Sequence, residues 1–91
     1  MEKLKQLGVR EAGQTMLQGK ACAEVLLGMA GGTGLDNMSD GHREAFWLGM
    51  MAALCGQMAA MVGATAGSEI VESCRAGMFS AEAAFRKKEA H

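Results

Sequence analysis

The stretch of sequence that decides the fold is residues 46–64, which read FWLGMMAALCGQMAAMVGA. It belongs to a longer run, residues 45–68, that contains no charged side chain. On a helical wheel at about 100° per residue, large side chains gather on one half and small ones on the other, and only Gln57 breaks the pattern. The large half comprises Phe46, Trp47, Leu48, Met50, Met51, Leu54, Cys55, Met58, Met61 and Val62. A helix that is apolar all round is typically buried all round.

The small half of this predicted helix forms a smooth face. Its members are Gly49, Ala52, Ala53, Gly56, Ala59, Ala60, Gly63 and Ala64. A second helix can approach such a face closely, because residues three and four apart lie side by side and none carries a long side chain. We predict an interface between copies of the chain that is formed by Gly49, Ala52, Gly56, Ala60 and Gly63. We interpret the methionines of the other half as core, with an adaptable docking groove or a soft-metal stripe as alternatives.

The rest of the chain also favours helices. Pro is absent and Ala and Met are abundant, although the 13 Gly each weaken a helix interior by about 1 kcal/mol. We predict helices over residues 10–30, 39–64 and 68–89, with a frayed or separate turn before them that ends at Gly8. Residues 31–38 read Gly-Gly-Thr-Gly-Leu-Asp-Asn-Met and are predicted to form the loop between the first two helices.

Capping residues mark the predicted helix ends. Gly31 and Gly32 should stop the first helix, because Gly readily takes the left-handed conformation common at helix C-termini. Ser39 should cap the next helix, with Asp40 complementing the helix dipole. Residues 65–68 leave two alternatives open, a break with Ser68 as N-cap or a bend within one long helix.

These elements predict an all-α fold in a single helical domain, residues 1–91. A helical hairpin or three-helix chain of 91 residues cannot easily surround a helix that is apolar on every face. The simplest solution packs that helix against its own copy, because a symmetric interface needs only one self-complementary patch. We therefore expect a homo-oligomeric helical bundle.

Composition narrows the class of protein. The chain has 9 basic and 10 acidic residues and a net charge of −1, which does not favour nucleic acid as a partner because such binding depends on Lys and Arg. A hydrophobic content of 49% argues against disorder. The three cysteines, Cys22, Cys55 and Cys74, fall on apolar helical faces and predict free thiols in a reducing environment. The first residues lack the apolar stretch of a signal peptide, so we expect a cytoplasmic protein.

No arrangement of residues predicts catalysis, a metal site or a cofactor. Asp40, His42 and Glu44 cluster near Asp36, but residues two apart on a helix point away from each other, so we interpret the acidic pair as dipole partners. Residues 31–34 are rich in Gly but lack the preceding strand and the Lys of a phosphate-binding loop. We therefore predict a protein that is not an enzyme.

Binding residues are expected on the surfaces that packing leaves free. Residues 68–89 carry a narrow apolar stripe, Val71, Cys74, Met78, Ala81 and Phe85, on an otherwise polar helix. The polar face carries Arg75, Glu82, Arg86 and Lys87, and the loop carries Thr33, Leu35, Asp36, Asn37 and Met38. Arg75 and Arg86 could hold an anionic ligand or an acidic protein surface as bidentate donors.

The function that fits these features is that of a small helical oligomer that binds a protein or an anionic small ligand. A compact chain of this size without catalytic residues fits an inhibitor or adaptor of bacterial or phage type. A holin-like membrane protein is the alternative, because residues 46–66 are uncharged and would span about 31 Å as a helix. The Gln57 at its centre and the scarcity of Leu and Ile count against that alternative.

Overall fold

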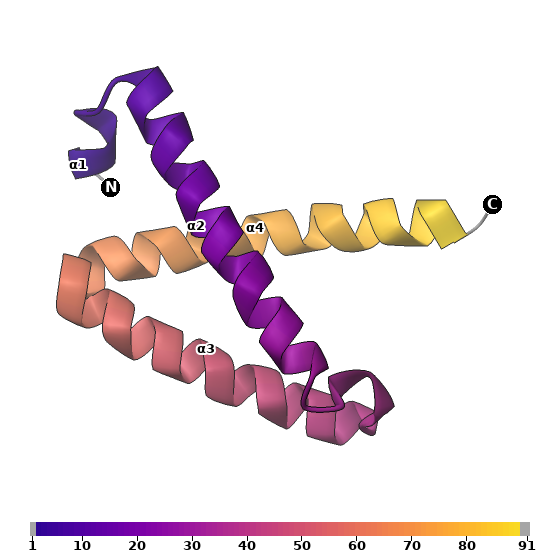
Figure 1. The fold of residues 1–91 in the computed structure, drawn as a ribbon. Coiled ribbons are helices and arrows are strands. Elements are labelled where there is room, and N and C mark those ends of the chain that lie inside the picture. The colour runs from indigo at the N-terminus through magenta and orange to yellow at the C-terminus, as the bar shows by residue number, and fades with distance from the viewer. Residues whose placement is uncertain (1, 90–91) are drawn as a thin grey trace. The chain divides into compact units, whose positions relative to one another are not determined.

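The computed structural model describes residues 2–89, and all the regular structure in that range is helical. A short helix α1 (Glu2–Lys5) precedes α2 (Val9–Gly31), the 3₁₀ turn η1 (Leu35–Asn37), α3 (Asp40–Val62) and α4 (Ala64–Glu89), as Figure 1 shows. The predicted all-α class is confirmed. The separate turn before Gly8 is present as α1, and α2 and α3 lie within two residues of the predicted ranges.

The described chain falls into two compact units, each of which is considered by itself. One unit is Glu2–Ala52, which contains α1, α2, η1 and the first half of α3. The other begins at Ala53 and contains the second half of α3 together with α4. The division lies inside α3, which runs without a break from Asp40 to Val62.

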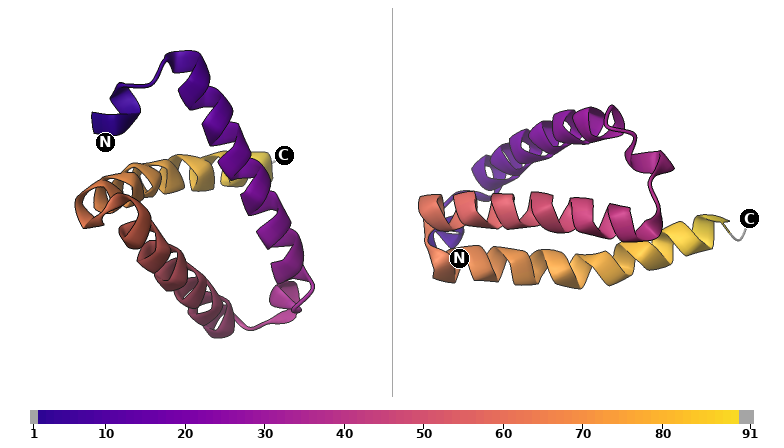
Figure 2. Two further views of the ribbon diagram at one scale, coloured as in Figure 1. Left: turned by 60° about the vertical axis from the view of Figure 1, so that its left-hand side comes forward. Right: turned by 90° about the horizontal axis from the view of Figure 1, so that it is seen from below.

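The loop after α2 reverses the chain through Gly34 and not through the glycine pair at the helix end. α2 ends at Gly31 with Gly32 as its C-cap, as predicted, but Gly32 has a right-handed conformation, with φ −65°, so the left-handed conformation predicted there is wrong. The left-handed residue is Gly34, with φ +80°. Thr33 contributes to the end of α2, because its amide (3.0 Å) and its hydroxyl (2.6 Å) both donate to the carbonyl of Ala30. Figure 2 shows the resulting loop between α2 and α3.

Ser39 caps α3 as predicted. Its Oγ accepts a hydrogen bond from the backbone amide of His42 at 3.2 Å, which satisfies one of the amides that a helix start leaves free. The same hydroxyl lies against the Nδ1 of His42. His42 is therefore held at the helix start by Ser39.

Arg43 ties the loop to the first turn of α3. Its Nε donates to the carbonyl of Leu35 at 3.2 Å, and its guanidinium also donates to the carbonyl of Asp36. A third interaction joins Nη1 to the Asp40 carboxylate at 3.3 Å. The planar guanidinium can serve these acceptors together because its donors point in fixed directions.

The break between α3 and α4 occupies a single residue, Gly63. Its φ of +88° is left-handed, a conformation that costs a residue with a Cβ roughly 1–2 kcal/mol. The Gly63 amide donates to the carbonyl of Ala59 at 3.0 Å, and the Gly63 carbonyl accepts from the amide of Gly67 at 3.0 Å. Gly63 thus ends α3 and also caps α4.

The predicted break with Ser68 as N-cap is wrong, as is the alternative of a bend at residues 65–68. Ser68 lies in the second turn of α4, which begins four residues earlier than predicted. The physical reason is that Gly63 takes the left-handed conformation without the steric cost that a Cβ adds, so Thr65 and Ser68 are not needed to end or to begin a helix.

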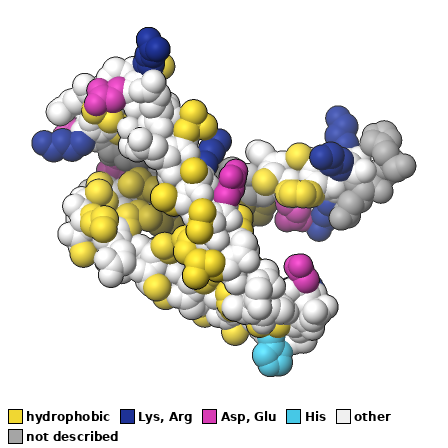
Figure 3. Space-filling view, in the orientation of Figure 1, with side chains coloured by type: hydrophobic (Ala, Val, Ile, Leu, Met, Phe, Trp, Pro, Cys, Tyr) yellow, Lys and Arg dark blue, Asp and Glu magenta, His cyan; other side chains and the backbone are white. Residues whose placement is uncertain are grey.

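Burial within the described residues is very limited. Among them, Ala30 (5% exposed) is the one buried hydrophobic side chain, and Gly67 is the one other buried residue. Large apolar side chains remain on the surface, as Figure 3 shows for one face of the molecule. Leu48 is 72% exposed and Met61 79% exposed. A single copy of the chain therefore leaves most of its apolar helix surfaces uncovered.

The loop should depend on Arg43 more than on any other charged residue. Replacing it, Arg43→Lys, keeps the charge but removes the fork of donors, so the amides of Asn37 and Met38 should exchange with solvent about fivefold faster, the equivalent of about 1 kcal/mol for a lost hydrogen bond. Hydrogen exchange followed by NMR measures this. Arg75→Lys is the control, because Arg75 pairs with a carboxylate of its own helix, that of Glu72, and not with a loop carbonyl. Equal exchange in both variants would contradict the role of Arg43.

Candidate functional site

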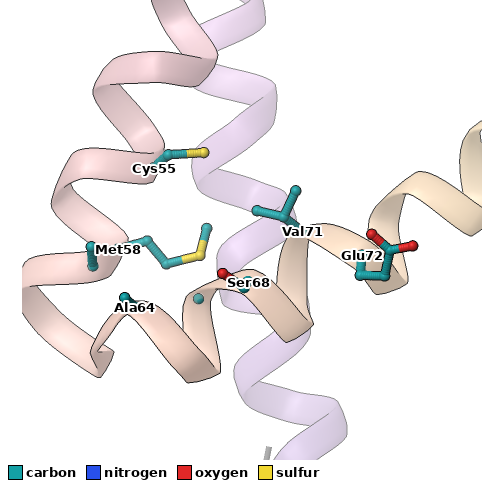
Figure 4. A pocket seen from close by; sticks show the side chains of 8 residues that line it. Cys55, Met58, Ala64, Ser68, Val71 and Glu72 are labelled. Carbon is teal, nitrogen blue, oxygen red and sulfur yellow. The ribbon is translucent and has the colours of Figure 1, made fainter.

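In the second unit a hollow lies between the end of α3 and the start of α4. It has a volume of about 450 Å³. Its lining residues are Cys55, Met58, Ala59, Ala64, Gly67, Ser68, Val71 and Glu72. Figure 4 shows Cys55 and Met58 on α3 facing Ser68 and Val71 on α4. We refer to it as the hairpin hollow.

The side chain of Met58 packs against α4 at Gly67. A Cβ added at Gly67 would lie 3.6 Å from the Sδ and 3.7 Å from the Cγ of Met58, so the thioether of Met58 lies close to the backbone of α4. This contact explains why Gly67 is buried. A flexible, polarisable side chain suits an irregular surface of this kind. The hollow is therefore suited to apolar side chains rather than to a polar substrate.

The polar groups at the rim are few. Cys55 is a half-buried free thiol, and the Glu72 carboxylate lies at the edge, where it pairs with Arg75 at 3.4 Å. Residues 2–89 contain no group of three or more side chains placed to hold a metal ion, so Asp36, Asp40, His42 and Glu44 do not form one. The hollow offers apolar packing surface together with the thiol of Cys55, the hydroxyl of Ser68 and the carboxylate of Glu72.

The predicted polar face of α4 is a mixed-charge face. Arg75 pairs with Glu72 at 3.4 Å, and Arg86 pairs with Glu82 at 2.6 Å, the latter being the predicted four-residue pair. All four side chains are more than half exposed, so each pair contributes only about 0–1 kcal/mol. An anionic ligand would compete with these carboxylates for Arg75 and Arg86. Lys87 lies beside them in the last turn.

Sequence reasoning missed an aromatic residue on the same face. Phe79 lies four residues after Arg75 and seven before Arg86, so it shares their side of α4. Its side chain is 70% exposed. The predicted stripe of α4 is also uncovered beyond its first turns, since Met78 and Phe85 are each 69% exposed. The signal for Phe79 was present in its spacing from the two arginines.

Some of the loop residues predicted to bind a partner already make hydrogen bonds within the chain, and others are exposed. The Thr33 hydroxyl is used at the end of α2, and the carbonyls of Leu35 and Asp36 are used by Arg43. Asp36 and Asn37 lie exposed in η1. Sequence reasoning missed that Arg43 holds this loop, because nothing in the sequence reveals which side chain will bind a loop carbonyl.

The small face of α3 is open at its two glycines, Gly49 and Gly56, whereas Ala59 of the same face lines the hairpin hollow. A Cβ added at Gly49 or at Gly56 would meet nothing within 4 Å. Ala52 and Ala60 are exposed as well. Gly63 was predicted to belong to this face of one helix, but it lies at the break and is not part of α3. The face is available, and the single chain leaves it open.

A second, shallower hollow lies in the first unit, between the end of α2 and the middle of α3. Its volume is about 250 Å³. Its lining residues are Leu26, Met29, Ala30, Thr33, Phe46 and Met50. Phe46 stands edge-on to Trp47, with ring centroids 6.4 Å apart. Like the hairpin hollow, this surface is apolar.

The comparisons with known proteins add no relative to this description. No protein-family model matches the chain, and neither the curated proteins nor the solved structures contain a significant match.

Proposed function

We propose that this chain is a non-enzymatic binding module that works as a homo-oligomer of helices. The observation that carries the proposal is the exposure of α3. An 18-residue window of this helix has a mean hydropathy of 1.6, and none of that window is buried within the chain. An exposed apolar surface of this length favours association, at about 25 cal/mol per Å² of apolar area removed from water.

A second copy is the simplest cover for α3. The helix has no charged residue after Glu44, so two copies meet without burying an unpaired charge. The open positions at Gly49 and Gly56 permit a close approach of two backbones. Because the interface is the same patch on each copy, a two-fold arrangement closes without leaving an apolar end exposed.

The assembled protein would act through its polar surfaces. Arg75, Phe79 and Arg86 combine two guanidinium groups with an exposed aromatic ring, a composition typical of interface hot spots. An acidic protein surface or an anionic small ligand fits this face better than nucleic acid does, because the carboxylates of Glu72 and Glu82 balance its charge. An inhibitor or adaptor in the cytoplasm is the role that we propose for such a protein.

If copies of the chain associate through α3, the substitution Gly56→Leu should lower the stability of the protein; in an isolated helix it should raise it. In an isolated helix, Gly56→Leu should be stabilising by up to about 1 kcal/mol, because Leu is the better helix former. In a close helix pair it should instead cost roughly 1–3 kcal/mol through overpacking. We expect a lower melting temperature and a smaller mass by light scattering in detergent-free buffer. Gly19→Leu in α2, where a Cβ also meets nothing within 4 Å, is the control. A stabilised Gly56→Leu variant of unchanged mass would refute the interface.

The polar face of α4 is tested by charge reversal. With a partner captured on wild-type protein, the double change Arg75→Glu and Arg86→Glu should weaken binding by at least about tenfold, because two charged donors are lost. The control is Arg10→Glu with Lys20→Glu, which alters the charge equally on α2. Light scattering confirms that each variant keeps its mass. Retained binding by an intact oligomer would place the binding surface at Asp36 and Asn37 instead.

A membrane protein is the second candidate, and the same exposure of α3 favours it. The helix is long and apolar enough to cross a bilayer. It ends at Val62, so the alternative span over residues 46–66 is interrupted by the break at Gly63. The uncharged part of α3, residues 45–62, is about 27 Å long, at the short end of the spanning range. After expression, a spanning protein stays in the membrane fraction during an alkaline carbonate wash, whereas we expect the chain in the supernatant. Retention in the membrane fraction would favour the span.

A further inference from the structure

We propose that the apolar stripe of α4 pairs with the same stripe of a second copy, and that the two helices run antiparallel. The inference rests on the proposed self-assembly and adds a second contact to the one through α3. It also makes the proposed binding face of α4 a surface that two copies build together.

The stripe has the spacing of a two-helix seam. Its steps of three and four residues, from Val71 to Phe85, are those of the a and d positions of a seven-residue repeat, and one more step of three reaches Lys88. The stripe starts in the hairpin hollow, which Val71 lines (Figure 4). Beyond Val71, Cys74 is exposed, and Met78 and Phe85 are each 69% exposed. One copy therefore leaves this part of the stripe in contact with water.

The sizes of the side chains favour an antiparallel pair. In one antiparallel register Met78 lies opposite Ala81 of the partner subunit, and Phe85 lies opposite Cys74 of the partner subunit. Each large side chain then meets a small one, which fills a seam evenly. A parallel pair would place identical residues opposite each other, and Lys88 would meet Lys88 of the partner subunit.

The same register brings opposite charges together beside the seam. Arg75 and Glu82 occupy the e positions between Val71 and Lys88. The e positions of two antiparallel helices face each other, so Arg75 lies beside Glu82 of the partner subunit and Glu82 lies beside Arg75 of the partner subunit. Each pair of copies gains two ion pairs in this way. This complementarity identifies a second copy as the cover for the stripe.

The other side of the seam carries small residues. Gly77 and Ala84 occupy its g positions, which also face each other in an antiparallel pair. A Cβ added at Gly77 would meet nothing within 4 Å in the single chain. The two backbones can therefore approach closely on this side, while the ion pairs form on the other.

The ion pairs within α4 do not prevent those between copies. Arg75 pairs with Glu72 and Arg86 with Glu82 inside one chain, and all four side chains are more than half exposed. Exposed pairs of this kind are weak. A guanidinium also has enough donors to serve two carboxylates, so Arg75 can hold Glu72 and the partner's Glu82 together.

Pairing would enlarge the proposed binding face. In an antiparallel pair the e positions of both copies lie on one side, so Arg75 and Glu82 of each copy share a surface. Phe79 and Arg86 lie at the neighbouring b positions, farther from the seam. A bound protein or ligand would then meet a Phe79 ring from each of two copies, and a single copy would present half of the surface.

Distances between copies test the register. Spin labels are attached singly at Ser73→Cys, Ser80→Cys or Lys87→Cys after the three native cysteines are replaced by Ala. These positions are seven residues apart and lie away from the seam. The two-fold axis of the antiparallel pair passes between Phe79 and Ser80. Two labels at residue 80 are therefore nearly level, whereas two labels at residue 73 or 87 are about 20 Å apart along the helix axis.

We expect the shortest distance at residue 80 and longer, nearly equal distances at residues 73 and 87. Equal distances at all three positions would show a parallel pair and overturn the proposal. An assembled chain without a short distance at residue 80 would overturn it as well. Either result leaves the proposed self-assembly through α3 intact, whereas a wild-type chain that is monomeric at every concentration overturns both.

Exchange of the two charges supplies a readout without labels. Arg75→Glu or Glu82→Arg alone sets like charges opposite each other twice in each pair of copies. The midpoint concentration of assembly, measured by sedimentation, should then rise by at least about fivefold. The double change Arg75→Glu with Glu82→Arg should return the midpoint to within about twofold of the wild-type value, because both ion pairs between copies form again. Association through α3 is not altered, so partner binding by Arg75 variants is compared above this midpoint.

The pairs within one chain respond in the opposite way. The double change sets like charges against both Glu72 and Arg86, so an effect that arose within α4 would be larger in the double variant than in either single one. Arg86→Glu is the control, because it breaks a pair within the chain and leaves the seam unchanged. A double variant that assembles no better than the single variants would overturn the α4 contact.

Discussion

One constraint governs the rest of the structure: the apolar side chains of α3 are not buried by other residues of the same chain. α3 carries no charge after Glu44, yet none of its apolar window is buried. A hydrophobic core supplies most of the favourable free energy of folding, so a chain whose only buried side chain among residues 2–89 is Ala30 has little of it. Whatever covers α3 must therefore provide most of the stability of the folded state. Self-assembly and membrane insertion are two answers to the same constraint, and the charged ends and mixed-charge face of α4 favour the first.

Local features of the fold were predictable wherever a residue acts on its own neighbours. Ser39 caps α3, and Glu82 pairs with Arg86 one turn away, because both interactions are fixed by spacing along a helix. The prediction failed where several residues of one type could each adopt the same conformation. Gly31, Gly32, Gly34, Gly63 and Gly67 are all able to end a helix, and only the structure shows that Gly34 and Gly63 take the left-handed conformation. Arg43 could not be assigned, because a carbonyl seven or eight residues away leaves no pattern in the sequence.

The candidate sites show the same division. The small face of α3 was predicted from the periodicity of its residues. That its glycines Gly49 and Gly56 have open space beside them could be learned only from the structure, because an apolar sequence does not show which side of a helix is covered. The basic face of α4 was predicted from Arg75 and Arg86, while their pairing with Glu72 and Glu82 turns it into a mixed-charge surface. The ion pairs on this face are exposed and therefore weak, and the ring of Phe79 beside them is exposed as well. The recognition that we propose for this face would require a partner to displace those ion pairs.

The most direct test of this account is hydrogen exchange of the α3 amides at two protein concentrations in detergent-free buffer. Association protects whatever it covers, in proportion to the fraction of chains assembled. If copies of the chain cover α3, the amides of residues 46–62 become more strongly protected as the concentration rises, while those of α1 do not change. Protection of α3 that is the same at both concentrations would contradict the account.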